Sequence, residues 1–124
     1  EIALNQIAAG SQAVFAVAGQ CGLGSLDGAK EKGKWGIGVD ADQAYLGSHM
    51  LTSALKKVDV AVFEAAQAVK AGKFKGGTDR IFTVKSGGVG LGKVSKRVPK
   101  SLVAQTLKLQ KLVSAGKVRP PKTL

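Results

Sequence analysis

The stretch that decides the fold is AVFAVAGQCGLGSLDGAKEKGKWGIGVD, residues 13–40. Residues 13–18 are a short, continuous apolar run, which is typical of a strand that is buried on both faces of a parallel sheet. Residues 25–32 predict a helix capped by Ser25, and residues 35–39 predict a second strand that ends at Asp40. Residues 13–40 therefore predict one strand–helix–strand unit with parallel strands.

Further elements are expected on both sides of this unit. They are, in chain order, a helix at 1–9, a loop at 41–49, a strand at 50–55, a helix at 58–71, a strand at 80–84, a glycine- and lysine-rich loop at 85–97, and a helix from near Pro99 to about 115. A glycine stands where each predicted helix should stop: Gly10, Gly33, Gly72 and Gly116. The order predicts an α/β protein with a mostly parallel sheet.

Length and composition bound the class of protein. The 124 residues leave room for one small domain, and four short strands cannot easily bury both faces of a parallel sheet. The helix at 1–9 has a stop but no capping residue at its start, so we expect the chain to be a piece of a longer protein. The single Cys21 and the single His49 exclude an internal disulfide and a metal site built from Cys or His clusters.

The charge is distributed unevenly along the chain. Residues 1–69 hold five Lys and seven acidic residues, whereas residues 70–124 hold fourteen Lys or Arg and only Asp79 as an acid. The two parts therefore carry net charges of −2 and +13. This asymmetry predicts a basic surface over the second part of the chain, and it leaves a nucleic-acid or polyanion partner open.

Two glycine clusters are candidates for phosphate binding. Gly22, Gly24 and Gly28 follow the first strand with the spacing G-x-G-x-x-x-G, which resembles the dinucleotide fingerprint and also suits a tight turn beside another ligand. Gly87, Gly92 and Lys93 match the spacing of a P-loop, but Val94 replaces the hydroxyl residue that would hold Mg²⁺. The first cluster therefore remains a candidate ligand loop, and the second is interpreted as an ordinary loop.

Asp40 is the strongest candidate for a ligand contact. It stands at the carboxyl end of a predicted parallel strand, where open α/β sheets bind their ligands. One carboxylate there can accept hydrogen bonds from two neighbouring hydroxyl groups, as in a diol. Asp42 lies two residues further on an extended chain, so the two side chains need not form a catalytic pair. His49 has no evident partner in the sequence, which contains no G-x-S-x-G elbow either, so no catalytic constellation is predicted.

Four segments of the sequence resemble a known family when they are taken together. They are EIALNQIAAGSQAVFAVAGQCGLG (1–24), GAKEKGKWGIGVDADQAYLG (28–47), MLTSALKKVDVAVFEAAQAVKAGKFKGG (50–77) and SGGVGLG (86–92). In this order they are similar to the basic membrane protein family of ABC-transporter binding lipoproteins, whose best-understood members are purine nucleoside receptors. The similarity runs through residues 1 to about 92 and is looser over the last helix.

The resemblance implies a type I periplasmic binding fold, in which two α/β lobes close on a ligand, with this chain as its C-terminal third. Residues 1–50 would be part of the C-terminal lobe. Residues 51–84 would recross the hinge and add a helix and a strand to the N-terminal lobe, and residues 85–124 would form the glycine- and lysine-rich loop and the last helix.

The resemblance also implies the site residues. Asp40 of the GVD motif would hold the ribose hydroxyls, and Lys56 of the TS-x-x-K motif would help to hold the sugar. Gly19 and Gly22 would line the cleft through their backbone. Cys21 departs from the small hydroxyl residue that is usual there, which bears on ligand preference.

The implied protein is no enzyme and needs no cofactor and no metal. Its partners would be a nucleoside of purine type and an ABC permease. A lipid anchor outside this chain would hold the protein at an extracytoplasmic membrane face. Nucleic acid is not an implied partner. The alternatives that the residues alone leave open are a basic nucleic-acid or polyanion-binding module and an enzyme with a dinucleotide cofactor.

Overall fold

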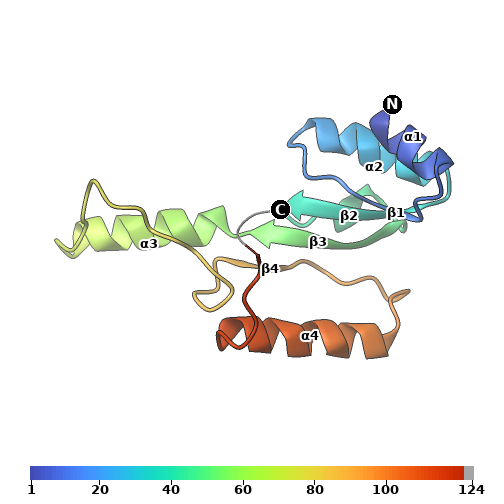
Figure 1. The fold of residues 1–124 in the computed structure, drawn as a ribbon. Coiled ribbons are helices and arrows are strands. Elements are labelled where there is room, and N and C mark those ends of the chain that lie inside the picture. Colours follow the sequence, from blue (N-terminus) through green and yellow to red (C-terminus); the bar gives the residue numbers. More distant parts are fainter. Residues whose placement is uncertain (122–124) are drawn as a thin grey trace.

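One mixed sheet organises the computed structural model, which describes residues 1–121 (Figure 1). Its strands lie in the order β1-β2-β3-β4. The first three run parallel: β1 (Ala13–Phe15), β2 (Trp35–Asp40) and β3 (Met50–Lys56). β4 (Val89–Leu91) pairs antiparallel with the end of β3. The expected α/β class with a mostly parallel sheet is confirmed.

Four helices surround the sheet unequally. α1 (Ile2–Ala8) and α2 (Cys21–Glu31) cover one face, and α4 (Lys100–Ser114) lies beyond the other face (Figure 1). α3 (Val58–Lys70) projects away from the sheet in direct continuation of β3, and a short 3₁₀ turn, η1 (Ala44–Leu46), connects β2 towards β3. Within residues 1–121, no helix combines the length and the apolar character that crossing a bilayer requires.

The hydrophobic core lies between the sheet and the pair α1 and α2. Its buried members come from both helices and from β1, the residue after it and β3: Ala3, Ile7, Val14, Ala16, Leu26, Ala29 and Met50. Small residues let the layers approach closely, since a Cβ built on Gly28 in α2 would lie 3.2 Å from the Leu4 side chain in α1. The packed helices thus hold the sheet in place, and the sheet in turn positions the loops at its carboxyl edge.

The four predicted helix stops are confirmed. Each glycine adopts a positive φ after the last residue of its helix: Gly10, Gly33, Gly72 and Gly116. At Gly33 the N–H groups of Gly33 and Lys34 donate to the carbonyls of Lys30 and Ala29, which is the Schellman pattern that satisfies the last turn of a helix. The sequence thus encodes where these helices end through residues that tolerate left-handed backbone.

The predicted start of the second helix is wrong. α2 begins at Cys21, four residues before Ser25, and Ser25 lies inside the helix. Gln20 occupies the N-cap position and, within the described chain, provides no side-chain hydrogen bond there. The helix starts early because Gly22 allows its first turn to pack closely on the end of β1, where a larger side chain would meet the Ala16 carbonyl.

The predicted strand at 80–84 is also wrong, because these residues form no strand in the described chain. Arg80 pairs with Glu64 of α3, and Thr83 and Ser86 exchange hydrogen bonds that close a turn. The fourth strand lies instead at Val89–Leu91, inside the predicted loop 85–97, where the chain reaches the free edge of β3. A β-branched and aromatic run favours a strand only where an edge is within reach.

Two helices have apolar faces that this chain leaves uncovered. None of the described residues of α3 is buried, and its apolar side chains Val58, Val62 and Val69 are more than 60% exposed. Between α4 and the sheet lies a cavity of about 640 Å³, which Leu102, Val103 and Leu107 line from the helix. Leu102 and Leu109 of α4 are half exposed.

Candidate functional site

The carboxyl ends of β2 and β3 bring an acid and a base together. Asp40 is the last residue of β2 and Lys56 is the last residue of β3, and the register places Asp40 opposite Leu55. The Lys56 Nζ lies 2.7 Å from Asp40 Oδ1. Two residues that are 16 positions apart in the sequence thus form an ion pair at the edge where parallel sheets bind ligands.

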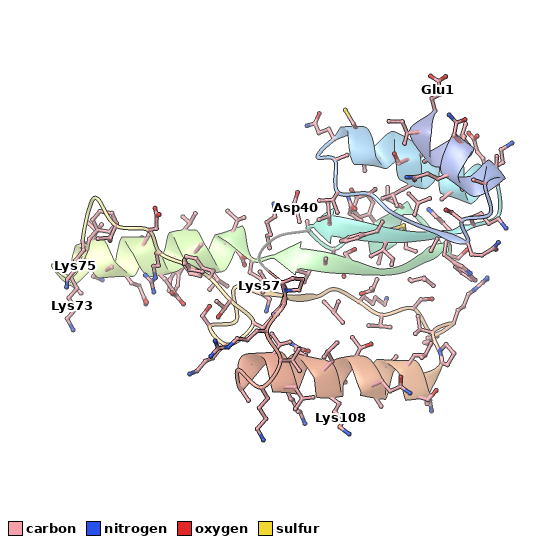
Figure 2. The ribbon with its side chains drawn as sticks, viewed as in Figure 1. Glu1, Asp40, Lys57, Lys73, Lys75 and Lys108 are labelled. Atoms are coloured by element: carbon pink, nitrogen blue, oxygen red, sulfur yellow. The ribbon has the colours of Figure 1, made fainter. Side chains whose placement is uncertain are left out.

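Asp40 has an unusual backbone. Its φ is 69°, and it is the one residue other than glycine with a positive φ in the described chain. Asp and Asn tolerate this left-handed conformation better than other side chains, at a cost of about 1–2 kcal/mol. Its side chain is about half exposed at the end of the strand (Figure 2), so the ion pair leaves carboxylate surface open to a ligand.

A cavity of about 580 Å³ opens beside this ion pair. It lies where β2 and β3 end and α3 begins, and its wall consists of Asp40, Ala41, Asp42, Leu55, Lys56, Lys57, Val58, Asp59 and Val60. The volume falls within the range of about 300–1,000 Å³ that is common for small-molecule sites. The wall combines both charges with apolar side chains, so it suits a ligand with a hydroxylated part and an apolar part.

Asp42 has a different role from Asp40. Its Oδ2 accepts a hydrogen bond from the Lys93 backbone N–H at 2.9 Å, and its Oδ1 accepts one from the Ala44 N–H at 3.2 Å. The backbone of Gly92 approaches so closely that a Cβ there would lie 2.9 Å from the carboxylate. Asp42 therefore ties the loop after β2 to the segment after β4, in agreement with the expectation that the two acids need not form a catalytic pair.

Sequence reasoning missed a polar network under this loop. The Gln43 N–H donates to Ser53 Oγ at 3.0 Å, and Gln43 Oε1 accepts from the Val39 N–H at 3.1 Å. Ser53 is fully buried, and a Cβ on Gly38 would collide with both polar side chains. A serine inside the apolar strand MLTSAL was the signal that a buried hydrogen-bond partner exists.

Gly19 lies in the turn after β1 and Gly22 in the first turn of α2, at the same edge of the sheet as Asp40, but they do not line the cavity. Gly19 has a φ of 53° and open space where a Cβ would stand. Gly22 is buried, and a Cβ on it would lie 2.9 Å from the Ala16 carbonyl oxygen, so it has a packing role. Their predicted role as ligand contacts remains a prediction.

The remaining polar candidates lie apart from the cavity. Cys21 is an exposed free thiol at the first position of α2. Both ring nitrogens of His49 are buried and, within the described residues, have no hydrogen-bond partner. Burial and then the positive charge of Lys30 lower the pKa of His49 against smaller opposing effects of the Leu26 backbone and Asp27. Residues 1–121 contain no cluster of three His, Cys, Asp or Glu residues that could hold a metal ion.

Comparison with known proteins places these features in a family context. Residues 1–122 match the family model Bmp, described as ABC transporter substrate-binding protein PnrA-like. The chain is 38% identical over 109 residues to the ABC transporter nucleoside-binding protein BmpA of Lactococcus lactis, a match that covers 73% of this chain and 31% of that protein. It is 30% identical to the CD4+ T-cell-stimulating antigen of Listeria monocytogenes, over 98% of this chain and 39% of that protein.

Solved structures share the fold. A transcriptional activator of the comK gene from Bacillus halodurans superposes with a TM-score of 0.86 at 24% identity, over 94% of this chain and 41% of that one. An ABC transporter solute-binding protein from Aeropyrum pernix superposes with a TM-score of 0.80 at 22% identity, over 98% of this chain and 44% of that one. The chain thus spans about a third of the length of the curated relatives and under half of these structures.

Proposed function

The chain belongs to the Bmp family of PnrA-like ABC transporter substrate-binding proteins, and we propose that the complete protein is the substrate-binding component of an ABC importer for a nucleoside, of purine type. The observation that carries the proposal is the Asp40–Lys56 ion pair on the wall of the cavity at the carboxyl edge of the sheet. The name of the Lactococcus lactis relative, a nucleoside-binding protein, supports the class of ligand.

The position of the cavity supports a cleft between two lobes. β1–β3 share a core with α1 and α2, whereas none of the described residues of α3 is buried. β3 runs directly into α3, and the cavity lies at that junction (Figure 1). We therefore assign residues 1–50 to the C-terminal lobe, 51–84 to a hinge crossing and the N-terminal lobe, and 85–124 to the terminal loop and helix. Within the described residues, the segment 51–84 then holds most of β3 and all of α3, and residues 80–84 add no further strand.

The chemistry of the ion pair suits a ribose. Asp40 presents a carboxylate that can accept hydrogen bonds from two neighbouring hydroxyls, and Lys56 donates to the same group or to a ring or hydroxyl oxygen. Exposed ion pairs are worth only about 0–1 kcal/mol, so a sugar can exchange its hydroxyls for part of the Lys56 contact at little cost. The backbone before α2, at Gly19 and Gln20, lies at the same edge of the sheet and would add N–H groups if the ligand reaches it.

The proposed role sets the partners and the location. A substrate-binding component delivers its ligand to an ABC permease on the extracytoplasmic side of the membrane, held there by a lipid anchor outside the described residues. Binding and release require no bond chemistry, so we propose neither a catalytic residue nor a cofactor.

The test is nucleoside titration by calorimetry on the complete protein that contains this chain. Asp40→Asn keeps a side chain that tolerates positive φ but removes the charge, and it should weaken binding about 10- to 100-fold, as expected for loss of charged hydrogen bonds. Lys56→Gln should weaken binding less, because Asp40 remains.

Asp27→Asn is the matched control, since Asp27 is an exposed acid on α2 outside the cavity wall. It should leave the affinity unchanged. A loss of less than threefold for Asp40→Asn would remove Asp40 from the site. Binding of adenosine, guanosine, uridine and ribose in parallel ranks the ligands, and no binding of any of them would sink the proposed function.

A further inference from the structure

The last 45 residues of the chain combine a strong positive charge with an absence of acids. Residues 80–124 contain eleven Lys or Arg residues and no Asp or Glu. Among the described residues of this stretch, Arg80 pairs with Glu64 of α3, and Arg97 stacks over the Trp35 ring at 5.7 Å. The lysines of α4 have no such partner among the described ion pairs. A surface with this charge attracts anionic partners.

α4 divides this stretch into an inner and an outer side. Leu102, Val103, Thr106, Leu107 and Gln110 line the cavity towards the sheet. Lys100, Lys108 and Lys111 recur at helical spacing on another side of the helix, and all three are exposed. Figure 2 shows Lys108 pointing away from the sheet. We call these three residues the α4 lysine face.

We propose that the α4 lysine face binds anionic phospholipid headgroups, so that the protein contacts the membrane surface by electrostatics. The helix α4 has 15 residues and is therefore about 22 Å long, so it can lie parallel to a planar layer of headgroups. Lysine clusters near a membrane gain binding energy from the negative surface potential without any fixed geometry.

The same composition disfavours the other anionic partners. No aromatic residue follows Phe82, so the surface lacks the stacking platforms of single-strand binders and the Tyr or Trp anchors of protein interfaces. Lys outnumbers Arg by eight to three in residues 80–124, whereas bidentate reading of phosphates or carboxylates is the property of Arg. Diffuse headgroup charge fits this surface better than a nucleic acid or an acidic protein.

The test is co-sedimentation of the complete protein, in a form without lipid modification, with phosphatidylcholine vesicles that contain either no phosphatidylglycerol or about 30 mol% of it. We expect binding to the anionic vesicles only, and its loss when the salt rises from about 0.05 M to about 0.5 M. The double variant Lys108→Gln, Lys111→Gln should lower the partition constant about 30-fold.

The matched control is Lys73→Gln, Lys75→Gln, which removes the same charge at the far end of α3 (Figure 2). This control variant should change vesicle binding less than threefold, and both double variants should bind nucleoside with the affinity of the protein that carries no substitution. Equal losses in the two variants, or no binding to anionic vesicles at low salt, would overturn the proposal. It also fails if the α4 variant keeps vesicle binding but loses binding to a short DNA duplex, because the face then serves nucleic acid.

Discussion

At the residue scale, two glycines of one helix have opposite surroundings. Gly22 and Gly24 both lie in the first turn of α2. A Cβ on Gly22 would lie 2.9 Å from the backbone oxygen of Ala16, which cannot turn aside, whereas a Cβ on Gly24 would meet nothing within 4 Å. Gly22→Ala should therefore destabilise the protein by about 1–3 kcal/mol through overpacking. Gly24→Ala should stabilise it by up to about 1 kcal/mol through helix propensity. Thermal melts of the two variants check this, and a stabilised Gly22→Ala would contradict the packing.

His49 gives a pH dependence with a definite sign. Burial and Lys30 lower its pKa in the folded state below the ordinary value of about 6.5. The unfolded chain then binds the proton more readily, so the stability contribution is complete above about pH 6.5 and is lost as the pH falls towards the lowered folded pKa. The melting temperature should drop between about pH 7 and pH 5, and His49→Gln should reduce that drop. Identical pH profiles for both proteins would show that other groups dominate.

The sequence predicts part of the candidate site by two routes. Asp40 follows from its place at the end of a parallel strand, where open sheets bind ligands, whereas Lys56 is implied only by the family resemblance, and the structure places it at the end of the neighbouring strand. The contact between Asp42 and Lys93 could not be predicted, because it joins residues 51 positions apart and depends on where β4 pairs. The segment GVDAD also does not predict the left-handed φ of Asp40, because aspartate adopts both right-handed and left-handed backbone conformations.

At the element scale, the sequence predicts where the helices end, but neither the start of α2 nor the position of the fourth strand. The four glycines that end helices act within one turn, so the sequence alone locates them. The fourth strand depends instead on an available edge, and β4 forms at Val89–Leu91 because Gly88 accepts the N–H of Lys57 as the chain returns from α3. Intrinsic preference favoured residues 80–84 for the strand, and tertiary pairing decided otherwise.

β4 should be held in place by Asp42. Because this carboxylate accepts the Lys93 N–H immediately after β4, Asp42→Ala should release that end of the strand. The exposed hydrogen bonds are worth about 0.5–1.5 kcal/mol, so global stability should change little. Hydrogen exchange at Gly92 and Lys93 should accelerate, whereas exchange in β2 stays slow. Asp27→Ala on α2 is the control, and unchanged exchange after β4 would contradict the role of Asp42.

At the scale of the whole molecule, the core is one-sided. Buried apolar residues lie between the sheet and the helices α1 and α2. On the opposite face, a cavity separates the sheet from α4. α3 projects away from the sheet, and none of its described residues is buried (Figure 1). The apolar side chains that remain more than half exposed include Phe15, Val58, Val62, Phe63 and Val69. Val58, Val62 and Val69 lie on one side of α3, and exposed apolar side chains grouped in this way indicate an interaction surface. In the proposed two-lobe receptor, the other lobe covers α3.

The 124-residue chain on its own should therefore associate. Burying the exposed apolar face of α3 gains about 25 cal/mol for each Å² removed from water, so contact between copies is favoured as the concentration rises. Sedimentation velocity should show species that grow with concentration, and nucleoside binding should be weak or absent because, in the proposed receptor, the chain supplies one side of the cleft. Val62→Gln, Phe63→Gln should reduce the association without touching the core, since both side chains are more than 60% exposed. A monomer that melts cooperatively and binds nucleoside would instead show that this chain forms a complete receptor domain, with α3 stable in water.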